Sequence, residues 1–136
     1  MVIDTSALVA ILRNEPERRD FLEAIDGADA CRVSAATLVE TSIVVEARFG
    51  IEGVQALDRF LQRAGVEVVP VDLEQARQAR QGFSRFGKGR DVAGLNYGDC
   101  FSYALATVVG EALLFKGNDF SRTDVGIAVP PRAAGA

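Results

Sequence analysis

The sequence contains no histidine and only two cysteines, and these absences exclude several kinds of active site. Without histidine the chain cannot build a Ser-His-Asp triad, a Cys-His pair or a histidine-ligated zinc site. The cysteines, Cys31 and Cys100, lack CxxC spacing and indicate neither a disulfide framework nor a thiolate metal site. We interpret both as small hydrophobic residues of the core.

Positive charge and long hydrophobic runs are also scarce. Fifteen Lys and Arg residues stand against 19 Asp and Glu, which gives a net charge of −4. This balance argues against indiscriminate coating of nucleic acid, which needs a broadly basic surface, but leaves local basic patches open. The first residues form no basic leader, and no apolar run approaches the ~20 residues of a membrane span. We therefore expect a soluble cytoplasmic protein with no membrane partner.

The length of 136 residues, with 49% hydrophobic residues, fits one domain. We predict that residues 1–130 form this domain and that 131–136 are a disordered tail. Predicted strands lie at 1–4, 30–34, 66–71, 112–115 and 126–129, and predicted helices at 5–14, 16–27, 35–50, 51–65, 73–86 and around Asp99. Short apolar strands alternating with helices predict an α/β fold, with a parallel sheet covered on both faces and a ligand site at the carboxyl ends of the strands.

Four acidic residues occupy unusual places in this pattern. Asp4 ends the first strand and Asp119 follows the 112–115 strand, so the topology puts both at the same edge of the sheet. Glu40 lies inside an apolar helix with no basic residue three or four positions away. Asp99 lies in the first turn of a helix that otherwise reads as buried. Each of Asp4, Asp99 and Asp119 also has a simpler explanation, as a helix cap or a turn residue.

Together the four acids favour a site for a hard cation. Clustered carboxylates repel one another, and a buried unpaired carboxylate costs several kcal/mol or becomes protonated. A divalent ion removes this penalty, and oxygen ligands alone suit Mg²⁺, or Mn²⁺, better than zinc or copper. Ser6 and Asn96 are candidates for polar contacts that orient the carboxylates, although both also fit ordinary helix-start positions.

A second candidate surface is basic. The segment 77–90 concentrates cations in an otherwise acidic chain: Arg77, Arg80, Arg85, Lys88 and Arg90. A phosphate backbone could bind there, although an ordinary solvated helix face explains the same pattern. The stretch from Gly82 to Gly89 imitates a phosphate-binding GxxxxGK loop but has Gly89 in place of Ser or Thr and follows a helix, so we reject that interpretation.

The segments "MVIDTSALVAIL", "TLVETSIVVEARFG", "GLNYGDCFSYALA" and "LLFKGNDF" resemble, in the same order, the PIN-domain toxins called VapC. The resemblance covers nearly the whole chain and implies a PIN-like three-layer α/β/α sandwich around a mainly parallel sheet of four to five short strands. It matches Asp4, Glu40, Asp99 and Asp119 to the acidic residues of the family. Asn118 stands where many relatives carry a further acid, which implies a weaker second metal site. Asp124 matches an acid often seen in close relatives, which makes it a further candidate, with Ser6 and Asn96, to orient the acidic group.

The resemblance further implies a Mg²⁺- or Mn²⁺-dependent endoribonuclease, the toxin of a toxin–antitoxin pair. Such proteins are usually homodimers that a VapB-like antitoxin masks, and their targets are structured RNAs, commonly tRNA or rRNA. The mechanistic hypothesis is hydrolysis of RNA by a metal-activated water, which leaves 5′-phosphate and 3′-hydroxyl ends.

Two alternatives stay open from the sequence. A receiver-like signalling domain also has acids at strand ends, but it expects two adjacent acids after the first strand and a lysine after a late one. Here Thr5 follows Asp4, and only Lys116 partly fits. A non-catalytic binding protein with the same fold is the second alternative.

Overall fold

The computed structural model describes residues 1–132, and the four residues that follow lie outside the described part. Four strands form one parallel sheet in the order β3-β2-β1-β4. They are β1 (Val2–Ile3), β2 (Arg32–Ser34), β3 (Glu67–Val69) and β4 (Leu113–Leu114). The helices are α1 (Thr5–Leu12), α2 (Arg18–Gly27), α3 (Ala35–Phe49), α4 (Ile51–Arg63), α5 (Leu73–Phe86) and α6 (Tyr97–Val109), and a 3₁₀ turn, η1, spans Phe120–Arg122.

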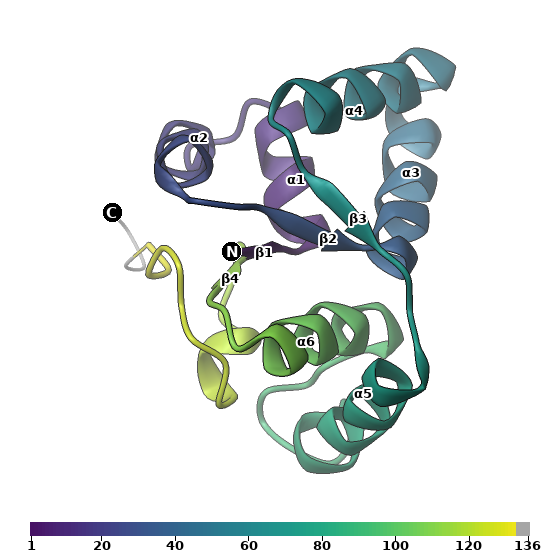
Figure 1. Ribbon diagram of the computed structural model, residues 1–136, viewed down its shortest axis with the longest axis vertical. Coiled ribbons are helices and arrows are strands. Elements are labelled where there is room, and N and C mark those ends of the chain that lie inside the picture. Colours follow the sequence, from purple (N-terminus) through teal and green to yellow (C-terminus); the bar gives the residue numbers. More distant parts are fainter. Residues whose placement is uncertain (133–136) are drawn as a thin grey trace.

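Helices cover both faces of the sheet, which makes three layers, and the strands β1 and β4 are fully buried whereas the edge strand β3 is largely exposed. Helices α1 to α4 lie on one side of the strands, and α5 and α6 lie on the other (Figure 1). Successive residues of a strand point to opposite faces, so Ile3 and Leu114 join the core under α1 to α4, whereas Val2 and Leu113 join the core under α6. The predicted α/β sandwich with a parallel sheet is confirmed.

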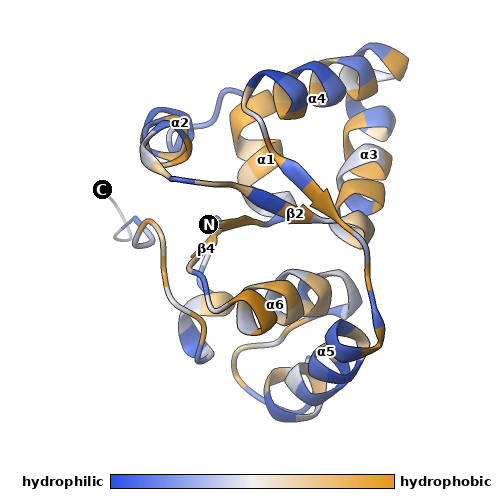
Figure 2. Cartoon of the chain, viewed as in Figure 1, coloured by the Kyte–Doolittle hydropathy of each residue, from blue (hydrophilic) through white to orange (hydrophobic). Residues whose placement is uncertain are grey.

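Hydropathy explains which helices are central. Helix α6 is apolar over much of its surface, whereas α5 is largely hydrophilic and covers only the outer side of α6 (Figure 2). Within α5 the buried residues Gln75, Ala79 and Gly82 recur at helical spacing and face α6. A Cβ at Gly82 would lie 2.5 Å from Cδ1 of the buried Tyr103, so glycine permits this close approach of the two helices.

The predicted fifth strand at 126–129 is reduced to one parallel bridge between Leu113 and Ile127. Leu113 donates its N–H to Gly126, and Ala128 donates to Leu113, but the ladder goes no further. Pro130 follows closely and has no N–H to continue it. In the predicted tail, Arg132 donates to the Pro16 carbonyl at 2.8 Å, and 133–136 lie outside the described residues.

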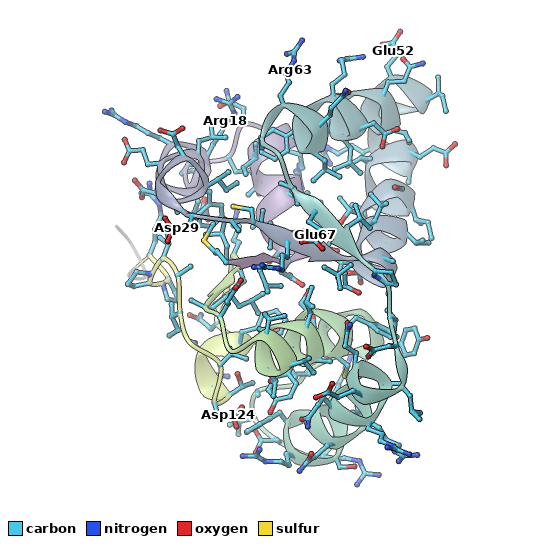
Figure 3. All side chains as sticks on the ribbon, viewed as in Figure 1. Arg18, Asp29, Glu52, Arg63, Glu67 and Asp124 are labelled. Carbon is cyan, nitrogen blue, oxygen red and sulfur yellow. The ribbon has the colours of Figure 1, made fainter. Side chains whose placement is uncertain are left out.

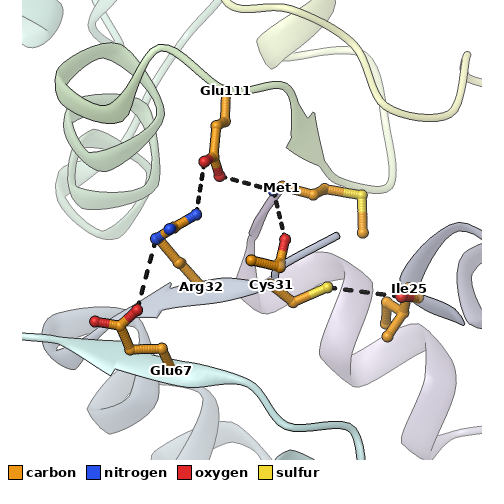
Figure 4. A network of polar contacts seen from close by, with 7 residues as sticks. Met1, Ile25, Cys31, Arg32, Glu67 and Glu111 are labelled. Atoms are coloured by element: carbon orange, nitrogen blue, oxygen red, sulfur yellow. Dashed lines mark hydrogen bonds and ion pairs between the residues drawn. The ribbon is translucent and has the colours of Figure 1, made fainter. Parts of the chain in front are cut away.

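Charges at the amino end of the sheet are paired with one another (Figure 4). Glu111 accepts from the amino group of Met1 at 2.7 Å and from Arg32 at 2.6 Å, and Arg32 lies 3.6 Å from Glu67. The hydrogen bond from the Met1 amino group is the main cause that lowers the pKa of Glu111 below its ordinary value. These ion pairs connect β2, β3 and the turn before β4 at one edge of the sheet.

None of the helices in the described range 1–132 combines the length and the hydrophobicity needed to cross a membrane.

Candidate active site

The carboxyl ends of the parallel strands bring the acidic residues to one edge of the sheet. Asp4 follows β1 and caps α1, and Asp119 follows β4 at the start of η1. Helix α3 begins at the end of β2 and carries Glu40. The first turn of α6 carries Asp99.

Asp4 is held by three hydrogen bonds and is only 2% exposed. Its Oδ2 accepts from the N–H of Ser6 at 3.0 Å and from the Ser6 hydroxyl at 2.7 Å. Its Oδ1 accepts from the Ser102 hydroxyl on α6 at 2.6 Å. All of these donors are neutral, so the carboxylate is fixed in orientation while its charge is not neutralised by a cation.

Glu40 lies half-buried between α3, α1 and the start of α6. Its Oε1 accepts from the Thr5 hydroxyl at 2.6 Å. Burial is the main cause that raises its pKa, the bond from Thr5 opposes the rise, and the nearby Asp4 charge adds to it. The Glu40 carboxylate therefore lies close to a second carboxylate with no cation between them.

Asp99 belongs to a capping box at the start of α6. The Asn96 side chain accepts from the Asp99 N–H at 2.9 Å, and the Asn96 N–H donates to Oδ2 of Asp99 at 3.0 Å. Burial raises the pKa of Asp99 to about 7, the bond from Asn96 opposes this, and the charges of Asp4, Glu40 and Asp119 add to the rise. Asp99 is therefore a helix cap and also the member of the acidic group that is most strongly perturbed.

The four carboxylates form a group without a cationic partner. Within residues 1–132, no Lys or Arg nitrogen lies within 4.0 Å of Asp4, Glu40, Asp99 or Asp119. Mutual repulsion at this edge is relieved either by protonation or by a bound cation. The donors are all oxygens, which fits Mg²⁺ or Mn²⁺ and not zinc.

The prediction that these side chains converge tightly was too strong. Across residues 1–132 no three or more Asp, Glu, Cys or His side chains are arranged closely enough to hold a metal ion by themselves. The Thr5 hydroxyl ties Glu40 of α3 to α1, Asn96 ties Asp99 to the start of its own helix α6, and Asp119 is exposed. Such an open set suits an ion that keeps several waters among its ligands, as Mg²⁺ does.

A group of buried hydroxyls supports the acids, and the sequence analysis missed it. Ser102 bonds Asp4 and lies 3.2 Å from Thr37, while Thr41 lies 3.0 Å from the Thr5 hydroxyl that bonds Glu40. Thr37, Thr41 and Ser102 are buried in helices that are otherwise apolar. Small hydroxyl residues on one face of two apolar helices are the signal that would have revealed them.

Gly98 was also missed, although it lies against Glu40. A Cβ at this position would stand 2.5 Å from Cδ of Glu40 and closer still to one carboxylate oxygen. Only a residue without a side chain lets the start of α6 approach Glu40 so closely.

Of the three predicted supporting residues, Ser6 and Asn96 contact the acidic residues and Asp124 does not. Ser6 bonds Asp4 and Asn96 bonds Asp99, as described above. Asp124, in contrast, accepts from the Tyr103 hydroxyl at 2.8 Å and pairs with Arg85 at 3.1 Å. It lies at the other end of α6 from the carboxyl ends of the strands (Figure 3). The expectation that Asp124 orients the acidic group is corrected, because both of its oxygens are engaged elsewhere.

The five basic residues predicted to hold RNA are all exposed, but they do not form one face. Arg85 is paired with Asp124 and stacks on Phe86, with Cζ 4.7 Å from the ring centroid. Arg90 lies 5.8 Å from the centroid of Phe83. Arg77 and Arg80 lie on α5, Arg77 on the side opposite the buried Gln75 and Ala79, and Lys88 is in the loop that follows α5.

Lys116 follows β4 but does not reach the acids. Its Nζ pairs with Glu15 at 3.1 Å and Glu17 at 3.3 Å. A receiver-like site needs such a lysine beside its strand-end carboxylates, so these ion pairs remove the feature that favoured that alternative.

Comparison with known proteins identifies the family. The family model for the PIN domain matches residues 1–126. The chain belongs to the PIN-domain family. It is 57% identical over 126 residues to "Ribonuclease VapC" of Mycolicibacterium smegmatis, which covers 92% of this chain and 97% of that protein. Divalent-metal dependence is general among PIN-domain nucleases.

Solved structures share the fold at low sequence identity. VapC20 of Mycobacterium tuberculosis, described as a sarcin-ricin loop cleaving toxin, is 19% identical with a TM-score of 0.76, and the match covers 94% of this chain and 97% of that one. A toxin–antitoxin complex from Klebsiella pneumoniae contains a chain 16% identical with a TM-score of 0.69, and covers 90% and 92%.

The raised pKa of Asp99 predicts a pH-dependent stability in metal-free protein. The folded pKa is about 7 and the ordinary value is 3.8, so folding opposes ionisation and this group destabilises the fold increasingly as pH rises from about 4 to about 7. Asp99→Asn removes this penalty. We expect the variant to be more stable than wild type in EDTA at pH 8 and equally stable at pH 4, as measured by urea unfolding. Equal midpoints at pH 8 would contradict a perturbed Asp99.

Proposed function

We propose that this protein is a divalent-metal-dependent endoribonuclease, the VapC-type toxin of a toxin–antitoxin pair. The observation that carries the proposal is the placement of four carboxylates at the edge where the parallel strands end, with no Lys or Arg nitrogen within 4.0 Å of any of them in residues 1–132. The identity of 57% to a VapC ribonuclease supports the same reaction.

The residues present fit a hard divalent cation. Asp4, Glu40, Asp99 and Asp119 are the proposed metal-binding and catalytic residues, with Mg²⁺ as the physiological ion and Mn²⁺ as a substitute. A cation held there would neutralise charge on the phosphodiester and lower the pKa of a water molecule. No protein nucleophile is required.

The other residues of the site hold the carboxylates in place. Ser6 and Ser102 fix both oxygens of Asp4, so this carboxylate cannot rotate. The Thr5 hydroxyl donates a hydrogen bond that orients the Glu40 carboxylate, and the Asn96 N–H donates one that orients the Asp99 carboxylate at the start of α6. Such fixed partners lower the reorganisation needed when substrate binds.

The substrate is a negatively charged backbone, and exposed cations near the site are proposed to position it. The proposed residues are Arg77, Arg80, Arg85, Lys88 and Arg90. Because Arg85 is engaged with Asp124, we assign it the weakest contribution. Contacts of this kind supply affinity and register but not base specificity.

Partners follow from the same assignment. A VapB-like antitoxin masks the active site, the toxin is a homodimer, and the RNA targets are structured cytoplasmic molecules such as tRNA or rRNA. The resemblance to VapC proteins and the toxin–antitoxin complex among the structural neighbours support these assignments.

The decisive experiment maps the ends of the cleaved RNA. Purified protein is incubated with RNA in Mg²⁺, Mn²⁺ or EDTA, and we expect cleavage only with a divalent ion, leaving 5′-phosphate and 3′-hydroxyl ends. Ends with 2′,3′-cyclic phosphate would show attack by the ribose hydroxyl and exclude the proposed mechanism. Absence of both cleavage and Mn²⁺ binding by calorimetry would favour a non-catalytic binding protein instead.

A further inference from the structure

A cavity of about 400 Å³ lies between α5 and α6, and its lining reaches the first turn of α6. Its α5 wall includes Ala79, Arg80 and Phe83, and its α6 wall includes Tyr97, Cys100 and Phe101. Apart from Arg80 at one side, these side chains are apolar or aromatic. The volume falls in the range of small-ligand pockets, and the lining offers stacking surfaces but few hydrogen-bonding groups.

Tyr97 stands at this cavity with most of its ring in solvent. It is 79% exposed, although a tyrosine ring is mainly apolar. Phe101 holds it edge to face, with ring centroids 5.0 Å apart and planes at 82°. The ring is thus fixed along one edge, while most of its surface is open for another planar group to stack on.

The cationic side chains around the cavity indicate an anionic occupant. Arg80 lines the cavity. Arg77 is not part of the lining, but it precedes Arg80 by three positions on α5 and lies about 60° from it around the helix axis. Arg85 is instead paired with Asp124. An apolar partner side chain would gain nothing from these two arginines, whereas a base attached to a phosphate backbone would.

The cavity and the acids share the first turn of α6. Tyr97 lies two residues before Asp99, and Gly98 between them faces Glu40. Two positions correspond to a rotation of about 200°, so the Tyr97 ring and the Asp99 carboxylate leave the same turn on different sides of the helix. An RNA strand that passes over the start of α6 can still reach both side chains.

We propose that this cavity receives one unpaired nucleobase next to the bond that is cleaved, stacked on Tyr97, while Arg77 and Arg80 contact the flanking phosphates. This inference rests on the proposed ribonuclease function and adds to it a position on α5 and α6 where one base of the substrate is held. Because the lining is nearly apolar, recognition depends on stacking and not on a hydrogen-bond code, so the identity of the base matters little.

The KM and kcat of RNA cleavage by matched variants test whether a base stacks on Tyr97. Tyr97→Leu is expected to raise KM about tenfold with little change in kcat, because base–aromatic stacking is worth on the order of 1–3 kcal/mol. Tyr97→Phe keeps the ring and is expected to behave as wild type. Phe49→Leu makes the same kind of change at a partly exposed ring on α3, outside the proposed site, and is expected to have no effect. An equal KM for Tyr97→Leu and wild type would overturn the proposal.

An abasic substrate identifies the stacked nucleotide. Removing one base beside the mapped cut is expected to raise KM of wild type about tenfold and to leave that of Tyr97→Leu nearly unchanged, since both changes delete the same contact. Independent, additive effects would show that Tyr97 and this base do not meet.

A binding measurement separates this proposal from the ribonuclease assignment. RNA carrying 5-iodouridine is photo-crosslinked to the protein in EDTA, where no cleavage occurs, and the adduct is mapped by mass spectrometry. We expect adducts on Tyr97 or Phe83. Crosslinks confined to other surfaces, or no RNA binding, would overturn the base pocket even if the protein cleaves RNA. Adducts at Tyr97 in a protein that never cleaves would leave the pocket intact and refute only the enzymatic function.

Discussion

Asp99→Asn is expected to abolish RNA cleavage while the protein stays folded. Loss of this carboxylate removes a charged oxygen from the proposed cation site, so we expect the rate to fall on the order of 1,000-fold. The fold survives because an asparagine oxygen can still accept the Asn96 N–H that closes the capping box. Single-turnover cleavage at saturating Mg²⁺ measures the first effect, and circular dichroism measures the second.

Asp124→Asn is the matched control for this prediction. It makes the same chemical change at a carboxylate that bonds Tyr103 and Arg85, away from the acidic group. We expect cleavage within a few-fold of wild type. A rate near wild type for Asp99→Asn would remove Asp99 from the mechanism, and a severe loss for Asp124→Asn would restore the role in the site that the structure denies it.

Gly98→Ala is expected to lower the metal affinity and the cleavage rate without destabilising the protein. The added methyl group would occupy the place of the Glu40 carboxylate, which must then leave its bond to Thr5. Because Glu40 is a flexible side chain, the fold can adapt, and alanine favours a helix over glycine by about 1 kcal/mol. Displacement of one supporting group at a metal site typically costs roughly 10- to 100-fold in metal affinity or activity.

The measurements for Gly98→Ala are Mn²⁺ affinity by calorimetry, the cleavage rate and the midpoint of urea unfolding. Gly27→Ala serves as the control, because a Cβ there meets no atom within 4 Å. We expect the control to keep full activity. If Gly98→Ala retains wild-type affinity and rate, Glu40 does not need its present position for catalysis.

Local patterns in the sequence were sufficient for most of the fold. Helix α5 spans the predicted residues 73–86, and the predicted strand at 112–115 contains β4, because apolar periodicity and flanking glycines are visible in a short window. The strand-end positions of Asp4 and Asp119 followed from the parallel topology alone. The roles of these acids in catalysis stay a prediction that the variants above address.

Other features depend on contacts between distant segments and could not be predicted in this way. The bond from Ser102 to Asp4 and the approach of Gly98 to Glu40 each join elements far apart in the chain. Asp124 was assigned by resemblance, but the position of the chain after η1 places it beside Tyr103. The strand at 126–129 was predicted from hydrophobicity, whereas its ladder is limited by the proline that follows.

The charged side chains at the two ends of the sheet differ in whether they are paired. At the amino end, Arg32 forms ion pairs with both Glu111 and Glu67, as Figure 4 shows. At the carboxyl end the acids have no such partners, and the molecule tolerates their repulsion. The ion pairs and the unpaired acids therefore lie at opposite ends of strands that are only two or three residues long. Substitutions at Glu111, Arg32 or Glu67 can consequently change the stability of the sheet without touching the proposed cation site.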